Sequence, residues 1–118
     1  MTTVTVTERK RRGAERLAEA AEAVIADLSA YARTGEGGRF IVFGSAASGN
    51  MRHNSDFDVI VDFPPGEETA AWHAVEESCA RHGIKPDVLP ASMTKQSFIE
   101  RIEKSTVRII RDAVDPAR

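Results

Sequence analysis

Apolar and polar positions alternate with a helical period through the first third of the chain. Between residues 7 and 32 the apolar side chains recur at steps of three or four, at Leu17, Ala21, Val24, Leu28 and Tyr31. This spacing places them on one face of a helix. Thr5 with Glu8 three residues later fits a capping box at its start, and Gly35 fits its end. The pattern predicts an amphipathic N-terminal helix over about residues 7–33.

Three short apolar runs follow, each bounded by glycine or proline. Residues 40–43 lie between glycines, residues 57–63 are stopped by a Pro-Pro-Gly turn, and residues 84–89 precede Pro90. Runs of this length with these boundaries predict strands. Residues 67–82, ended by Gly83, and residues 94–104 have helical spacing. Their inner faces would carry Ala71, Ala74, Val75, Ser78 and Cys79 in the first and Phe98, Ile99 and Ile102 in the second. Residues 107–110 fit either a short strand or a helix end.

The mixture of strands and helices predicts an α/β fold, and no repeat or linker divides it. At 118 residues the chain fits one domain, residues 1–118. No apolar run approaches the ~20 residues of a membrane span, and residues 1–7 lack the apolar core of a signal peptide. The single cysteine, Cys79, excludes an internal disulfide. We therefore expect a cytoplasmic protein without membrane association.

The charge of the chain bears on its partners. The net charge is −2, whereas proteins that hold long nucleic acids are usually strongly basic, so no long nucleic acid is expected. Four basic residues do cluster at 9–12. They fit a solvated first turn of the helix, and they also fit a contact with a partner or a phosphate.

One segment carries the strongest chemical signal. Gly44-Ser45 follows the first predicted strand, and after ten residues comes Asp56-x-Asp58 at the second. A turn from strand to helix offers unpaired N–H groups to phosphate oxygens, glycine allows a close approach, and serine adds a hydroxyl donor. The combination indicates phosphate chemistry.

The two aspartates fit a divalent metal site. Alternate residues of a strand share a face, so Asp56 and Asp58 would lie opposite the apolar positions, with Cα atoms roughly 7 Å apart. Both carboxylates could then bind one Mg²⁺ at ~2.1 Å. Asp62 has the same parity but would lie about 13 Å beyond Asp58, at the strand end. Asp87, on the third predicted strand, is either a third metal ligand or a turn residue following Pro86.

Competing motifs do not fit the same residues. A P-loop would need Lys and Ser or Thr where Asn50 and Met51 stand, and no serine has the Gly-x-Ser-x-Gly frame of a hydrolase. The three histidines are not spaced as a metal set. Each histidine fits a surface or helix position better than a ligand position, although Arg52 and His53, in the loop before the aspartate pair, could reach a substrate phosphate.

Together these residues resemble a minimal nucleotidyltransferase of the DNA polymerase β superfamily. The resemblance covers about residues 40–89: the Gly44-Ser45 turn, the Asp56-x-Asp58 strand, a helix, and a strand with Asp87. It implies a small mixed β-sheet with flanking helices. It also implies that Asp56, Asp58 and Asp87 are the catalytic metal ligands.

The resemblance implies further roles as well. Two Mg²⁺ ions and ATP would be bound, with Gly44, Ser45 and Arg52 on the nucleotide and Asp87 as general base. One residue departs from the family pattern: many relatives have a basic residue where Ser48 stands, which puts one phosphate contact in doubt.

Short members of this superfamily resemble the antitoxins of two-gene modules whose toxin is a helical HEPN ribonuclease. Such antitoxins transfer AMP from ATP to a tyrosine of the toxin. Transfer of AMP to a cognate HEPN toxin is therefore the leading hypothesis. A non-catalytic antitoxin that neutralises its partner by contact, and nucleotidyl transfer to a small molecule or an RNA end, are the alternatives.

Overall fold

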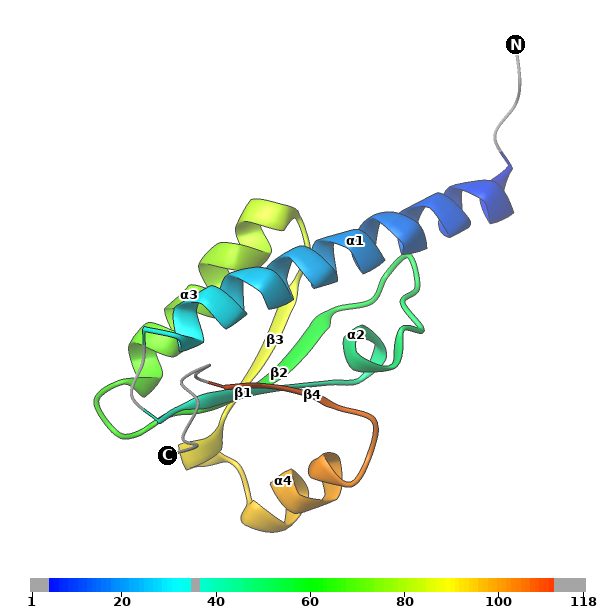
Figure 1. Ribbon diagram of the computed structural model, residues 1–118. Coiled ribbons are helices and arrows are strands. Elements are labelled where there is room, and N and C mark those ends of the chain that lie inside the picture. The colour runs from blue at the N-terminus through cyan, green and yellow to red at the C-terminus, as the bar shows by residue number, and fades with distance from the viewer. Residues whose placement is uncertain (1–4, 35–36, 112–118) are drawn as a thin grey trace, which may run out of the picture.

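The computed structural model describes residues 5–34 and 37–111. Figure 1 shows its helices and strands along the chain. They are α1 (Val6–Ala32), β1 (Arg39–Phe43), α2 (Ser45–Ser48), β2 (Phe57–Asp62), α3 (Glu68–His82), β3 (Pro86–Pro90), the 3-10 turn η1 (Ala91–Met93), α4 (Gln96–Glu103) and β4 (Arg108–Arg111).

The strands form one mixed sheet in the order β3-β2-β1-β4. β2 and β3 are parallel, whereas β1 pairs antiparallel with both β2 and β4. Helix α3 provides the crossover that a parallel pair requires. The predicted fold class, a small mixed sheet with flanking helices of the minimal polymerase-β type, is confirmed. The last segment, for which sequence left strand or helix end open, is the edge strand β4.

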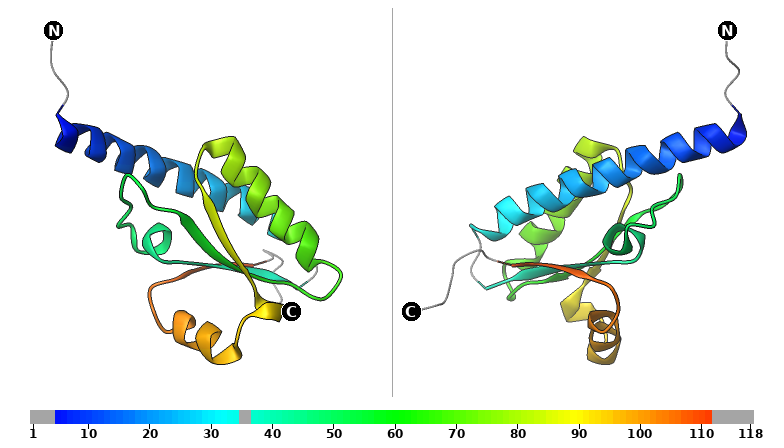
Figure 2. Two further views of the ribbon diagram at one scale, coloured as in Figure 1. Left: turned by 180° about the vertical axis from the view of Figure 1, so that it is seen from behind. Right: turned by 45° about the vertical axis from the view of Figure 1, so that its right-hand side comes forward.

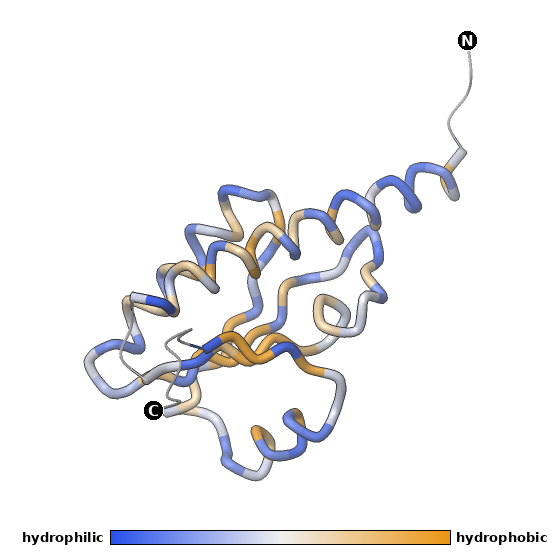
Figure 3. Tube along the Cα trace, viewed as in Figure 1, coloured by the Kyte–Doolittle hydropathy of each residue, from blue (hydrophilic) through white to orange (hydrophobic). Residues whose placement is uncertain are grey.

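The sheet lies between two helical layers. Helices α1 and α3 cover one face, and α4 with η1 covers the other, as both views of Figure 2 show. Phe57, Val59 and Val61 belong to the buried cluster on the side of α1, and Ile60 belongs to the cluster of Ile99 in α4. Both faces of β2 are therefore covered, which explains its nearly continuous apolar sequence. Figure 3 shows the same concentration of hydrophobic residues in the sheet.

The termini of several elements differ from prediction by one or two residues. The third strand begins at Pro86 rather than residue 84, because Ile84 closes the turn after α3, where its N–H donates to the Cys79 carbonyl (3.0 Å). Gly35, the predicted end of the first helix, lies outside the described residues. Helix α1 is capped at Arg33, whose N–H donates to the Ser29 carbonyl.

The start of α1 forms half of the predicted capping box. The Glu8 N–H donates to Thr5 Oγ1 (3.0 Å), but the Glu8 carboxylate pairs with Arg11 and Arg12 instead of reaching back. The basic residues 9–12 are exposed on a helix that extends beyond the sheet (Figure 1). Among residues 5–34 and 37–111, no helix is long and apolar enough to cross a membrane.

A cluster of polar side chains joins α1 to α3. Asp27 Oδ2 accepts hydrogen bonds from Ser78 Oγ (2.7 Å), Arg81 (2.8 Å) and His82 Nε2 (3.0 Å). The Ser78 hydrogen bond, then that of Arg81, lowers the pKa of Asp27 to about 2. Ser78 is buried, so its hydroxyl depends on this partner. Asp27 therefore holds the two helices in register on the sheet.

Replacing Asp27 should destabilise the fold. In Asp27→Ala the buried Ser78 hydroxyl loses its acceptor, so we expect the free energy of unfolding at pH 7 to fall by about 1–3 kcal/mol in urea denaturation. The lowered pKa means that ionised Asp27 stabilises the folded state above its unfolded value near 3.8. This contribution is lost as the pH falls toward 2, so the gap between wild type and variant should narrow below pH 4.

Glu19→Ala is the matched control, because Glu19 is an exposed carboxylate on the same helix. It should change the stability by less than about 0.5 kcal/mol. Equal effects of the two substitutions would contradict a specific role of Asp27.

Candidate active site

The chain turns sharply where β1 ends. Gly44 has φ 68° and ψ −150°, a backbone conformation that essentially only glycine adopts, and its carbonyl accepts hydrogen bonds from the N–H groups of Ala47 (3.2 Å) and Ser48 (3.1 Å). Ser45 opens the short helix α2, and Gly49, with φ 81°, ends it. A helix leaves its first N–H groups without partners inside the helix. The predicted turn with free donors at Gly44-Ser45 is thus formed as a strand–turn–helix.

Gly44 is also needed to make room for Asp58. A Cβ atom at Gly44 would lie 2.4 Å from Asp58 Oδ2, closer than van der Waals contact allows. The contact arises because Phe43 and Asp58 are partners in the antiparallel pairing of β1 with β2. The Gly44-Ser45 turn and the strand that carries Asp58 therefore meet directly. From sequence we expected glycine to admit a phosphate, and this second role was missed.

Two of the three candidate carboxylates, those of Asp58 and Asp87, lie on adjacent strands. Asp58 on β2 and Asp87 on β3 are partners in the parallel register, and paired strands lie about 4.8 Å apart. Asp58 is partly buried and Asp87 is exposed. This position makes Asp87 a strand residue at the site rather than an isolated turn residue.

The environment raises the pKa of Asp58 to about 6. Burial is the main cause, followed by the negative charge of Asp87, a hydrogen bond with Asp87, and the charge of Asp56. The ordinary value is 3.8, so these neighbours oppose a second negative charge here. A bound cation would relieve that repulsion. Perturbation of this kind is common at functional sites.

Asp56 is close enough to act on Asp58 electrostatically but is not gathered into a closed cluster. It precedes β2 and is partly buried. In the part of the chain that the structure describes, no group of three or more His, Cys, Asp or Glu side chains is placed to hold a metal ion. The structure thus brings Asp58, Asp87 and Gly44 together, and Asp56 stands beside them. Carboxylate oxygens are the ligands that Mg²⁺ prefers, so the donors fit such an ion in kind.

The other sequence candidates flank this cluster. Arg52 is exposed in the loop before Asp56; its N–H donates to Ser55 Oγ (2.8 Å), and its guanidinium forms no ion pair with any residue of 5–34 or 37–111. It is therefore available to an anion. Ser48 is exposed at the end of α2.

Asp62 is separated from the site. It ends β2 and pairs with Arg39, with Nε and Oδ2 2.8 Å apart, in agreement with its predicted place at the strand end. Arg39 also pairs with Glu103 of α4. Asp62 thus serves the packing of α4 on the sheet.

Helix α1 approaches the loop that carries Arg52, a contact that sequence reasoning missed. A Cβ atom at Gly13 would lie 3.0 Å from the Cβ atom of His53. The available signal was a glycine inside an otherwise helical pattern, which often marks close packing. The contact sets the loop's position ahead of the aspartates.

Comparison with known proteins agrees with this geometry. A family model described as "Nucleotidyltransferase domain" matches residues 24–113, a span that includes Gly44, Ser45 and the three aspartates. Among curated proteins, no sequence matches the chain. Members of the family generally use a nucleoside triphosphate and a divalent metal. With most of its length covered by the match, this chain belongs to the nucleotidyltransferase domain family.

Proposed function

We propose that this protein transfers AMP from ATP to a tyrosine hydroxyl of a cognate HEPN toxin in the cytoplasm, with Mg²⁺, and thereby acts as an antitoxin. The observation that carries the transfer reaction is the juxtaposition of Asp58 and Asp87 at one level of the sheet, with Gly44 packed against Asp58. The identity of the acceptor rests on the resemblance to minimal nucleotidyltransferase antitoxins.

The site residues divide into those that bind the triphosphate and those that would hold the metal ions. Ser45 and the N–H groups of its turn bind the β- and γ-phosphates, and the guanidinium of Arg52, which pairs with no carboxylate in the described part of the chain, adds a positive charge. Asp56, Asp58 and Asp87 would hold two Mg²⁺ ions, which supply charge neutralisation and alignment of the reacting oxygens. The carboxylates leave coordination positions for phosphate oxygens.

The transfer itself is a displacement at the α-phosphorus. The acceptor hydroxyl oxygen forms a bond to that phosphorus, the bond to the oxygen bridging to the β-phosphate breaks, and pyrophosphate leaves. Asp87 accepts the proton of the hydroxyl. Its exposure supports this role, since an acceptor on the surface of another protein can reach it.

A second function is favoured by a specific observation. Ser48 replaces a basic residue common in relatives, and the three carboxylates are not gathered into one metal-holding group among the described residues. Both features fit an antitoxin that neutralises its partner by contact alone. Transfer to a small molecule or an RNA end would use the same site with a different acceptor.

Removing Asp58 should abolish transfer without harming the fold. Incubation with the product of the adjacent gene, labelled ATP and Mg²⁺ should label that protein, and Asp58→Asn should reduce the rate by at least about a hundredfold. Because the pKa of Asp58 is raised, its ionisation lowers the stability of the folded state, fully so above pH 6, and the variant should be at least as stable as wild type at pH 8.

Asp62→Asn is the control, since Asp62 lies on the same strand and face but pairs with Arg39. It should retain labelling. Full labelling by Asp58→Asn would contradict catalysis at this site. Toxin neutralisation that survives Asp56→Ala and Asp58→Ala together, with no label, would establish the contact mechanism instead. Label on an RNA or a small molecule in an acceptor screen would identify that molecule, rather than a toxin tyrosine, as the acceptor.

Comparing alanine substitutions at Gly44 and Gly49 tests whether the clash with Asp58, in addition to backbone strain, damages the site. Gly44→Ala and Gly49→Ala both force alanine to a positive φ, at about 1–3 kcal/mol each. Gly49 is left-handed helical (φ 81°, ψ 7°), whereas Gly44 (φ 68°, ψ −150°) has a backbone conformation that essentially only glycine adopts. Only the Cβ at Gly44 would meet Asp58; among the described residues, no atom apart from Gly49's chain neighbours and its own helix backbone lies within 4 Å of a Cβ at Gly49. Titration calorimetry should therefore show weaker binding of Mg²⁺ and ATP by Gly44→Ala, with near-normal binding by Gly49→Ala. Equal losses would show that the clash with Asp58 is unimportant.

Metal binding should depend on pH through Asp58. Its pKa near 6 means that protons compete with Mg²⁺ below this value, so affinity should fall as the pH drops from 7.5 to 5. Removing the neighbouring charge and hydrogen bond in Asp87→Asn should lower the Asp58 pKa, although burial keeps it above 3.8. Carbon-13 NMR of the aspartate carboxyls measures both values. An Asp58 pKa that is unchanged by the substitution would refute the coupling.

A further inference from the structure

The two outer strands of the sheet differ in how they are protected. β3 has prolines at both ends, Pro86 and Pro90, which offer no N–H to an added strand. β4 (Arg108–Arg111) contains no proline, and within residues 5–34 and 37–111 it pairs only with β1. Its outer backbone groups are therefore a template for another strand.

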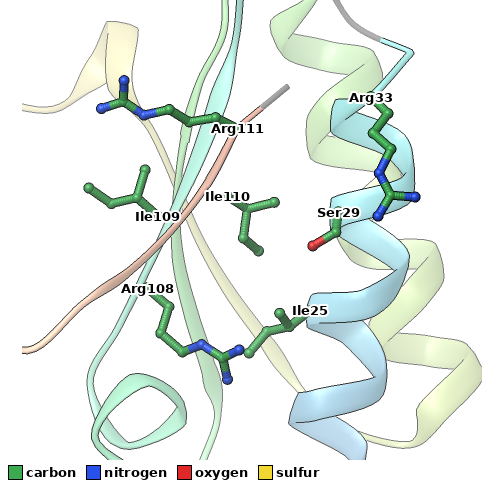
Figure 4. Close-up of a pocket in the computed structure, with 7 residues that line it drawn as sticks. All are labelled: Ile25, Ser29, Arg33, Arg108, Ile109, Ile110 and Arg111. Atoms are coloured by element: carbon green, nitrogen blue, oxygen red, sulfur yellow. The ribbon is translucent and has the colours of Figure 1, made fainter. Parts of the chain in front are cut away.

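A groove lies between this open edge and α1. It has a volume of about 270 Å³ and is lined by Ile25 and Ser29 of α1 and by the whole of β4. Figure 4 shows Arg108 and Ile110 on the side of the strand that faces α1, with Ile109 and Arg111 on the opposite side. A fifth strand beside β4 would thus lie partly beneath the helix, where Ser29 offers a polar contact.

The residues of β4 define what such a strand should carry. The strand reads Arg-Ile-Ile-Arg, and Ile109 is 40% exposed, one of three large hydrophobic side chains so exposed in the described residues. Arg108 pairs with Glu22 (2.6 Å), whereas Arg33 and Arg111 have no ion pair with any described residue. Across-strand pairing favours opposite charges and matched apolar residues. The complementary pattern is acidic-apolar-apolar-acidic.

Other occupants match these features less well. A second copy of β4 would bring another pair of arginines to the same seam, and like charges across strands destabilise a pair. A nucleic acid could meet the arginines but would leave Ile109 and the strand's backbone donors and acceptors without counterparts.

We propose that the outer edge of β4 binds an extended segment of a partner protein with the pattern acidic-apolar-apolar-acidic, which adds to the sheet as a fifth strand beside α1. The inference does not depend on nucleotidyl transfer, because no residue of the catalytic cluster takes part in it. Main-chain hydrogen bonds would provide the affinity, and Arg108 and Arg111 the selection of partner.

A short peptide tests the proposal without the natural partner. Titration of the full chain with Ser-Thr-Glu-Val-Val-Glu-Thr-Ser should shift the amide NMR signals of residues 108–111 and of Ser29, and should slow amide exchange in β4. Because two charge pairs form near the surface, affinity should fall as salt increases from 0.05 to 0.5 M. A peptide with Lys in place of Glu, or Pro in place of one Val, should bind at least about tenfold more weakly.

Charge reversal provides the matched variants. Arg108→Glu with Arg111→Glu should bind the acidic peptide at least about tenfold more weakly and should now prefer the Lys peptide. Arg9→Glu with Lys10→Glu makes the same change of charge at exposed positions on α1 and should bind like wild type. Circular dichroism checks that the edge variant is folded, since Arg108 loses its pair with Glu22.

Five results would overturn the proposal. Equal binding of the acidic and Lys peptides would contradict selection by charge. Equal binding of the acidic and Pro peptides would contradict binding by strand addition. Saturable self-association that blocks the peptide would assign the edge to a second copy, and competition by an oligouridylate would assign it to nucleic acid. Binding that appears only after deletion of residues 112–118 would assign the groove to the chain itself.

Discussion

The parallel pairing of β2 with β3 is the constraint on which the rest of the structure depends. It sets Asp58 and Asp87 at one level of adjacent strands, where burial and like charge raise the pKa of Asp58 to about 6. A parallel pair needs a crossover, which α3 supplies, and α3 is in turn tied to α1 through Asp27 and Ser78. The helices on this face thus serve to hold two mutually repelling carboxylates in place.

The antiparallel pairing of β1 with β2 adds the other half of the site. Because Phe43 is level with Asp58, the turn that follows β1 arrives directly against the carboxylate, and only glycine fits there. The Gly44-Ser45 turn and the carboxylates of Asp58 and Asp87 are consequently positioned by the same sheet, whose β2 is buried on both faces. A site on paired strands of a covered sheet is held more rigidly than one on loops.

Much of this arrangement was predictable from sequence, because it rests on local patterns. The apolar runs bounded by glycine and proline gave the strands, and the spacing of Gly44-Ser45 from Asp56-x-Asp58 pointed to the nucleotidyltransferase family, which the family match confirms. Pairings between distant segments were not predictable in detail. Three features depend on strand register: Asp87 lies level with Asp58, a side chain at position 44 would clash with Asp58, and Asp62 pairs with Arg39. The metal-binding, catalytic and nucleotide-binding roles of all six site residues remain predictions: Asp56, Asp58, Asp87, Gly44, Ser45 and Arg52.

The most direct test of the central claim is a crystal structure with Mn²⁺ and a non-hydrolysable ATP analogue, using the anomalous signal of manganese. We expect manganese to bind between the carboxylates of Asp58 and Asp87, with Asp56 as a further ligand. The triphosphate should lie against the Gly44-Ser45 turn. Nucleotide bound away from this turn, or manganese bound without contact to Asp58, would contradict it.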